Sequence, residues 1–334
     1  MNLKQIVKTP VRDAVFTLGS WYYRLSALEP IWRLKNWNPR RLYRRYAPEL
    51  RPAEAALALS LAADGVAVCH MDDLFPPEVF QGLLEMARAR WSAPEVASAV
   101  RERAAIAASG EKPKGVRKFF LVDLWDGPRD PLGGRVLLDP AHPFIRFSLA
   151  DPILRIVAAY LGMLSKFRFW HLEATIPAGR VGPLGSQRWH RDPEDQKLVK
   201  VFLYLSDVDD SSGPFTYLAA SHASGRWRHL FPLAPPRGSL PMPPDEDRFI
   251  PKEGVREFAG RAGTIIFCDT TGLHRGGLAR ESPRLMYTSV YTSPASPWPI
   301  RYAYPSNFNV AWLSPLARFA VANRPHQRPP KYFR

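Results

Sequence analysis

The segment QRWHRDPEDQ, residues 187–196, places His190 and Asp192 two positions apart within a run of charged residues. On an extended backbone, residues two apart point to the same side of the chain, so both side chains could bind one metal ion. One imidazole and one carboxylate are too few to hold the metal firmly, and an open non-haem iron site needs a second histidine. A solvated polar turn is the alternative interpretation of this segment.

His274 is the best candidate for the second histidine. It follows the apolar run in GTIIFCDTTGLHRGG, where a predicted strand opens into a glycine-rich loop. A jelly roll can bring His274 and Asp192 together by pairing strands that are far apart in the sequence. Ten residues later, Arg284 begins the run RLMYTSVYTS, and a guanidinium there could hold a carboxylate through two parallel hydrogen bonds. A second His-x-Asp, at His70 and Asp72, is interpreted as structural, because an aspartate there suits a helix N-cap.

The elements that must position these residues are short. From about residue 140 onward, short β-like runs are separated by Gly, Pro, Ser and Asp, a pattern typical of a β-sandwich or jelly roll. The predicted strands are 167–176, 198–208, 213–221, 263–269 and 284–293. Helices are predicted before them, including one at 53–63 and a long one ending near Trp91. The sequence therefore predicts a mainly β fold with flanking helices (α+β), with breaks at Pro10, Pro30 and Pro39 between the short helices near the N-terminus.

Charge divides the chain into three parts. Residues 1–51 hold 11 Lys/Arg and 3 Asp/Glu, and residues 301–334 hold 6 Lys/Arg and no acid, whereas the whole chain carries +15. The middle is therefore nearly neutral. We predict a basic, aromatic-rich helical segment at 1–60, a jelly-roll domain at 61–300 with an insertion near 232–254, and a basic tail at 301–334.

Cysteine usage and hydropathy indicate the compartment. Cys69 and Cys268 lie far apart in apolar runs, which favours buried thiols over a disulfide and fits a reducing compartment. Neither a run of 18 apolar residues nor a secretory apolar region is found. The expectation is a cytoplasmic protein that could lie peripherally at a membrane.

Three stretches carry a resemblance to a known family: QRWHRD, KVFLYLSDVDDSSGPFTYLAASH and AGTIIFCDTTGLHRGGLARESPRLMYTSVY. Together with ADGVAVCHMDDLFPPEVF, they resemble the phytanoyl-CoA dioxygenase-like family of Fe(II)/2-oxoglutarate-dependent dioxygenases over roughly residues 60–295. The resemblance implies a double-stranded β-helix of the cupin type. It also implies Fe(II) bound by His190, Asp192 and His274, with 2-oxoglutarate and O2 as cosubstrates.

The implied reaction is hydroxylation of a substrate C–H bond, with decarboxylation of 2-oxoglutarate to succinate. Arg284 would hold the distal carboxylate of 2-oxoglutarate, with Arg280 as a second candidate. The chain departs from the family pattern at Arg191, Gly276 and Met286. Thr288 lies on the same predicted strand face as Arg284 and could take the place of the missing hydroxyl residue near the cosubstrate.

Two other functions are open from the sequence. One is a non-catalytic β-sandwich module that binds an anionic membrane or polymer through its basic ends. The other is a zinc-dependent, cupin-type hydrolase or isomerase, in which Arg284 would have no role. For the enzyme, the expected partners are a small-molecule or lipid-linked substrate and an anionic membrane surface touched by the basic N-terminal segment, whereas nucleic acid is disfavoured.

Overall fold

The computed structural model describes residues 21–110, 120–131, 134–177, 179, 181–233, 246–306 and 308–322. The expectations for residues 1–20, for the middle of the predicted insertion at 234–245 and for the tail at 323–334 lie outside the described residues. The division into three parts stays a prediction.

A six-stranded antiparallel sheet forms the centre of the molecule, with the strand order β1-β8-β5-β10-β4-β2. A three-stranded antiparallel sheet has the order β7-β6-β9, and β3 and β11 form a short parallel pair. The strands of the large sheet are β1 (Val66–His70), β2 (Leu121–Asp123), β4 (Lys166–Thr175), β5 (Leu198–Tyr204), β8 (Thr264–Cys268) and β10 (Arg284–Thr292). The others are β3 (Val136–Leu137), β6 (Phe215–Leu218), β7 (Val255–Phe258), β9 (His274–Arg275) and β11 (Tyr302–Ala303).

The two faces of the large sheet pack against different parts of the molecule, because successive side chains of a strand point to opposite sides. On β5, Val199, Val201 and Leu203 belong to a core cluster shared with the helices. Phe202 and Tyr204, at the alternate positions, belong to a second cluster that also contains residues of β6. The large and small sheets therefore face each other across a second apolar core, which confirms the predicted double-stranded β-helix.

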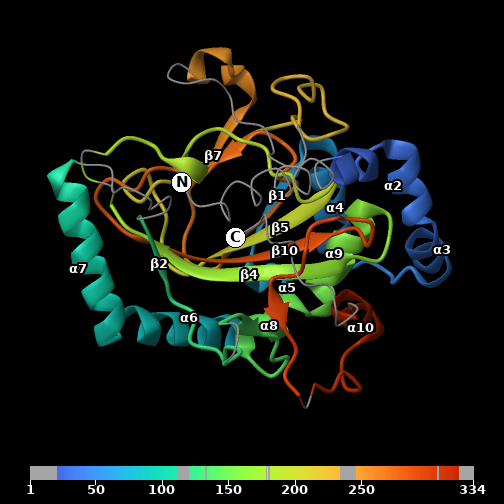
Figure 1. Ribbon diagram of the computed structural model, residues 1–334, viewed down its shortest axis with the longest axis horizontal. Helices are drawn as coiled ribbons and strands as arrows, with labels where there is room; N and C mark the ends of the chain where they lie inside the picture. The colour runs from blue at the N-terminus through green and yellow to red at the C-terminus, as the bar shows by residue number, and fades with distance from the viewer. Residues whose placement is uncertain are drawn as a thin grey trace, which may run out of the picture.

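Helices cover the outer face of the large sheet, and Figure 1 shows α6 and α8 on the opposite side of it from β7. Apolar residues of α4, α8 and α9 pack into the same core cluster as the outward side chains of β4, β5 and β10. The helices are α2 (Glu29–Lys35), α3 (Trp37–Tyr46), α4 (Pro52–Asp64), α5 (Met71–Leu74), α6 (Pro77–Trp91), α7 (Pro94–Ser109), α8 (Pro143–Ser148), α9 (Asp151–Leu161) and α10 (Pro315–Val321). None of the described helices is long and apolar enough to cross a membrane.

Two local predictions were wrong in how they placed helix boundaries. The helices near the N-terminus do break close to Pro30 and Pro39, but the breaks fall two or three residues before them; the prolines lie in the first turns of α2 and α3, where a missing N–H leaves no hydrogen bond unmade. Asp72 is not an N-cap. It lies inside α5, whose N-cap is His70, and the Asp73 carboxylate accepts from the His70 backbone N–H at 2.7 Å.

Candidate metal centre

Backbone pairing brings the two halves of the predicted site together. The His190 N–H donates to the His274 carbonyl at 2.9 Å, and the His274 N–H donates to the His190 carbonyl at 3.0 Å. The Asp192 N–H donates to the Thr270 carbonyl at 2.9 Å. Two residues that exchange both hydrogen bonds in an antiparallel bridge present their side chains on the same side. This pairing closes the long sequence gap that the jelly-roll prediction required.

The side chains of His190, Asp192 and His274 form one cluster, with their ligand atoms within 4.8 Å of one another. His190 Nε2 lies 3.6 Å from Asp192 Oδ1, and His274 Nε2 lies 3.1 Å from Asp192 Oδ2. The centroids of the two imidazole rings are 4.1 Å apart. These three residues could hold a metal ion through two imidazole nitrogens and one carboxylate, and their role as iron ligands stays a prediction.

Hydrogen bonds to the backbone fix the orientation of both imidazoles. Nδ1 of His190 donates to the Arg188 carbonyl at 2.8 Å, and Nδ1 of His274 donates to the Gly272 carbonyl at 2.9 Å. A proton on Nδ1 leaves the Nε2 lone pair free and directed at Asp192. Burial, together with the neighbouring His274 ring, lowers the pKa of His190 to about 4, which keeps this imidazole neutral at pH 7.

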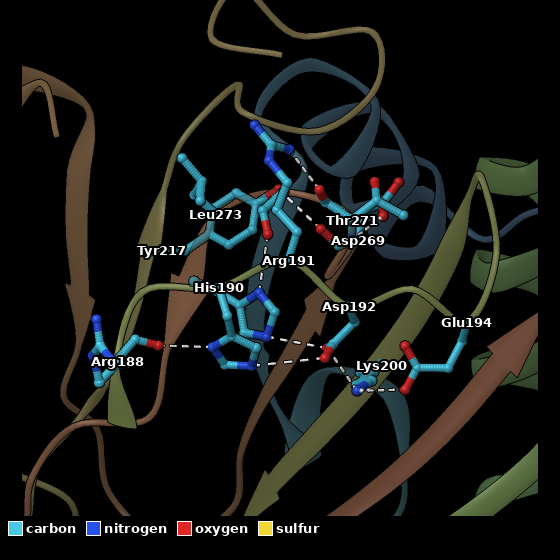
Figure 2. A network of polar contacts seen from close by, with 12 residues as sticks. Arg188, His190, Arg191, Asp192, Glu194, Lys200, Tyr217, Asp269, Thr271 and Leu273 are labelled. Atoms are coloured by element: carbon cyan, nitrogen blue, oxygen red, sulfur yellow. Dashed lines mark hydrogen bonds and ion pairs between the residues drawn. The ribbon is translucent and has the colours of Figure 1, made fainter. Parts of the chain in front are cut away.

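A buried lysine lies beside the carboxylate of the cluster. Lys200 Nζ donates to Asp192 Oδ2 at 2.7 Å and to Glu194 Oε1 at 3.3 Å (Figure 2). The side chains of Lys200, Asp192 and Glu194 are 13%, 14% and 6% exposed. Burial alone would lower the pKa of Lys200, but the two carboxylates raise it above its ordinary value. Burial would raise the pKa of Asp192, but Lys200 and the two histidines hold it well below its usual range.

Arg284 lies in the same cavity as the histidines and is only 3% exposed. Its Nη2 donates to Thr175 Oγ1 at 3.4 Å, whereas its Nε and Nη1 have no hydrogen-bond partner. Burial lowers the pKa of this guanidinium, an effect that the nearby Tyr204 opposes. Buried donors without partners are uncommon in native proteins, so this guanidinium keeps hydrogen-bonding capacity for a ligand with acceptor oxygens.

The cavity that joins these groups has a volume of about 380 Å³. Thr288, which is 9% exposed, and Met286 line it on the same face of β10 as Arg284. Gly276 also lines it, and a methyl group there would lie 3.7 Å from Arg284 Nη2. The predicted alternative, Arg280, is exposed and is not among the residues that line this cavity. The structure therefore places Arg284, not Arg280, where a cosubstrate carboxylate could reach it.

Sequence reasoning missed Lys200 and Gln187 and misplaced Glu194 and Asp195. Gln187 lines the cavity, is 4% exposed, and its Nε2 has no partner. The alternative interpretation of this segment as a solvated polar turn is wrong for Glu194 and Asp195. Both acids are buried: Glu194 pairs with Lys200, and the Asp195 carboxylate accepts hydrogen bonds from distant parts of the chain.

Arg191, the residue between the two proposed ligands of the His-x-Asp segment, points away from them into a ring of backbone carbonyls. Its Nη1 donates to the carbonyls of Ser221 and Thr271 at 2.6 and 2.5 Å, and its Nη2 donates to the Leu230 carbonyl at 2.9 Å. Figure 2 shows this guanidinium on the side away from Lys200. Arg191 therefore ties together the loops around the cluster, which explains why an arginine is accommodated here.

No protein-family model and no curated protein matches this chain. Among solved structures, the chain is similar to SnoN, a non-heme alpha ketoglutarate dependent epimerase from nogalamycin biosynthesis, with 17% identity over 72% of this chain and 83% of that one and a TM-score of 0.45. EctD from S. alaskensis matches with 16% identity over 78% and 91% of the two chains and a TM-score of 0.46. The non-heme monooxygenase ThoJ matches with 19% identity over 71% and 77% and a TM-score of 0.42. Likenesses this distant do not identify the reaction or the substrate.

Proposed function

We propose that this protein is a non-haem Fe(II)- and 2-oxoglutarate-dependent dioxygenase that hydroxylates a C–H bond of a small-molecule or lipid-linked substrate. The observation that carries the proposal is one cavity lined by both a His-Asp-His cluster and a buried arginine with two unpartnered nitrogens, Nε and Nη1. The sequence motifs that resemble the phytanoyl-CoA dioxygenase-like family support the same assignment.

The cluster fits a metal that needs open coordination positions. Two histidines and one carboxylate are the ligand set of the facial triad of non-haem iron oxygenases, which leaves positions for other ligands. In both histidines the Nδ1 proton is fixed by a backbone carbonyl, so Nε2 is the atom that would bind the metal. His190, Asp192 and His274 would therefore hold the iron.

The arginine fits a dicarboxylate cosubstrate. A guanidinium can hold a carboxylate with two parallel hydrogen bonds, and the buried guanidinium of Arg284, whose Nε and Nη1 have no protein partner, belongs to a residue that lines the cavity. Thr288 and Gln187 line the same cavity and could donate further hydrogen bonds to the cosubstrate or substrate. When bound, iron and 2-oxoglutarate supply the oxidising chemistry, with dioxygen as the oxidant and succinate and carbon dioxide as coproducts. The residues of this chain orient the ligands and exclude water.

The two rival functions leave part of this arrangement unexplained. A zinc hydrolase or isomerase would use the cluster but would leave the buried Arg284 without a ligand. A non-catalytic binding module would explain neither the imidazole orientation nor the buried guanidinium. A cavity of about 380 Å³ lies within the range of small-molecule sites.

The test is anaerobic titration of the Fe(II) protein with 2-oxoglutarate, followed by visible absorption. The dioxygenase is expected to develop a charge-transfer band, which the His274→Ala variant should lose. A screen of small acids, acyl thioesters and lipid-linked compounds for stimulated succinate formation would then identify the substrate class. If the folded wild-type protein binds Fe(II) but shows no band at saturating 2-oxoglutarate, the proposal is wrong.

A further inference from the structure

The N-terminal helices carry an unusual concentration of exposed apolar side chains. Of the eleven large hydrophobic side chains that are exposed in the described part of the chain, six lie between residues 21 and 37. They are Trp21, Tyr22, Leu25, Leu28, Leu34 and Trp37, which are 49–76% exposed. We call these six residues, together with the exposed basic residues of 21–45, the outer face. Figure 1 places α2 and α3 together on one flank of the molecule.

The same helices are anchored to the domain by a different set of residues. Tyr23 is 2% exposed, and its hydroxyl donates to the Pro297 carbonyl at 3.1 Å. Trp32 is 5% exposed, and its Nε1 donates to Asp195 Oδ1 at 2.7 Å. Asn36 is fully buried and accepts from the Ala295 N–H at 3.0 Å. These three buried residues, which we call the inner face, connect the helices to the domain, and they are distinct from the exposed side chains of the outer face.

The outer face is also strongly basic. Residues 21–46 contain seven Lys/Arg and one acid, Glu29, which is paired with Arg33 at 2.6 Å. Basic and aromatic groups alternate on it: Lys35 Nζ lies 5.1 Å from the centre of the Tyr22 ring, and the Arg41 guanidinium lies 5.1 Å from the Trp37 ring. The positive charge therefore lies among the exposed rings rather than on the opposite side of the helices.

We propose that the outer face docks peripherally on the surface of an anionic phospholipid bilayer. Trp and Tyr favour the headgroup region of a membrane, and Lys and Arg near the surface are attracted to anionic lipid. Exposed leucines would add apolar contact with the boundary between the headgroups and the acyl chains. This proposal does not depend on the proposed function.

The charge and composition of the outer face favour a lipid surface over a protein partner or a single-stranded nucleic acid. The centre of a protein–protein interface is depleted of charged residues, whereas this face alternates charge with aromatic side chains. Single-stranded nucleic acid stacks on aromatic rings beside basic residues, but it has no apolar layer that would bury the exposed Leu25, Leu28 and Leu34. Only a bilayer interface offers both anionic groups and an apolar layer to the same surface.

The experiment is co-sedimentation of the full-length protein with vesicles of phosphatidylcholine alone or mixed with phosphatidylglycerol. Point substitutions are preferable to deletion, because removing residues 1–51 would also remove the buried Trp32. Arg41→Gln/Arg44→Gln should weaken binding to the anionic vesicles about 25-fold, since each basic residue near the surface contributes about fivefold. The matched control is Arg88→Gln/Arg101→Gln, which removes two exposed arginines from α6 and α7.

A second pair of variants tests the aromatic contribution. Trp37→Ser should weaken binding to the anionic vesicles several-fold, whereas Trp312→Ser should not, although the two side chains are similarly exposed, at 59% and 56%. The proposal is overturned if the wild-type protein stays in the supernatant with anionic vesicles at low salt, or if either variant sediments like its control. It is also overturned if only a single-stranded oligonucleotide is bound, or if Trp37→Ser abolishes self-association without changing sedimentation.

Discussion

Lys200 is expected to compete with the metal ion for the Asp192 carboxylate. Its ammonium group lies 2.7 Å from Asp192 Oδ2 and 3.3 Å from Glu194 Oε1, and all three side chains are at least 86% buried. The lysine therefore provides the positive charge that these carboxylates need in the metal-free protein. A bound dication would provide charge for Asp192 from another direction. The Lys200→Met variant keeps the apolar stem and removes the charge. We expect it to be less stable than the wild type without metal and to bind the metal ion more tightly.

The magnitudes follow from the burial of the network. Removing one partner of a buried ion pair costs about 3–5 kcal/mol, because the remaining charge has no compensation. Metal-free Lys200→Met should therefore unfold roughly 10 °C below the wild type, since each kcal/mol shifts the melting temperature by about 2–4 °C in a protein of comparable size. A bound metal ion would restore the part of the lost unfolding free energy that comes from the uncompensated charge of Asp192. If that part is about half, or roughly 2 kcal/mol, the variant should bind the metal more than tenfold more tightly.

The assay is calorimetric titration with Co(II) as a redox-stable probe, together with thermal unfolding with and without Co(II). The matched control is Lys197→Met, because Lys197 also lies near the site in the sequence but donates to the Tyr160 carbonyl and not to Asp192. The control should leave Co(II) affinity unchanged. Weaker Co(II) binding by Lys200→Met than by the wild type would refute the reasoning, because Lys200 would then orient Asp192 for the metal instead of competing with it.

Three further outcomes are expected. Arg284→Ala should raise the 2-oxoglutarate concentration required for the charge-transfer band at least tenfold, since a charge-assisted pair contributes about 1.5–3 kcal/mol, whereas Arg280→Ala should not change it. Glu54→Gln should destabilise the protein by roughly 3 kcal/mol at pH 7 in urea unfolding, because Arg155 donates two hydrogen bonds to the fully buried Glu54. Burial raises the pKa of Glu54, but Arg155 and Arg51 lower it by more, so the folded-state pKa lies below the ordinary value. The stability that the ionised Glu54 contributes is therefore lost as the pH falls through the folded-state pKa. The difference in unfolding free energy between variant and wild type should narrow below about pH 4.5 and stay constant above it. Finally, the unmodified protein should not incorporate chloride into its product, because the carboxylate of the proposed ligand Asp192 would occupy the coordination position that a halide needs.

The strands and the distant histidine were predictable because their signals are local. The short apolar runs indicate where the strands lie, and the glycine-rich segment after His274 indicates the end of a strand. The alternation of side chains along a strand could have revealed Lys200: in LVKVFLY it shares the inner side with Phe202 and Tyr204, whereas Val199 and Val201 face the helices. A lysine at an inner position of a buried strand needs a buried partner, and Asp192 and Glu194 lie only a few residues before it.

The surroundings of Asp195 could not be predicted, because its partners are far away in the sequence. Its Oδ1 accepts from Trp32 Nε1 and its Oδ2 from the Ser293 N–H, each at 2.7 Å. Despite these donors, burial raises the pKa of Asp195 to about 6. No short-range pattern links an aspartate to a tryptophan 163 residues earlier, so the sequence does not reveal this pair. The fold brings the partners together through packing of α2 against the segment that follows β10.

The loop after the proposed metal ligand Asp192 is therefore fixed from three directions. Lys200 of β5 holds Glu194 from inside the site, Ser296 donates to the Glu194 carbonyl at 2.6 Å, and Trp32 of α2 holds Asp195. A ligand for a reactive metal must keep its geometry when the cavity fills, and neighbouring hydrogen bonds of this kind maintain it. The inner face of the basic N-terminal helices thus supports the proposed metal centre, while their outer face is exposed. One helical segment thereby connects the proposed chemistry with the proposed membrane contact.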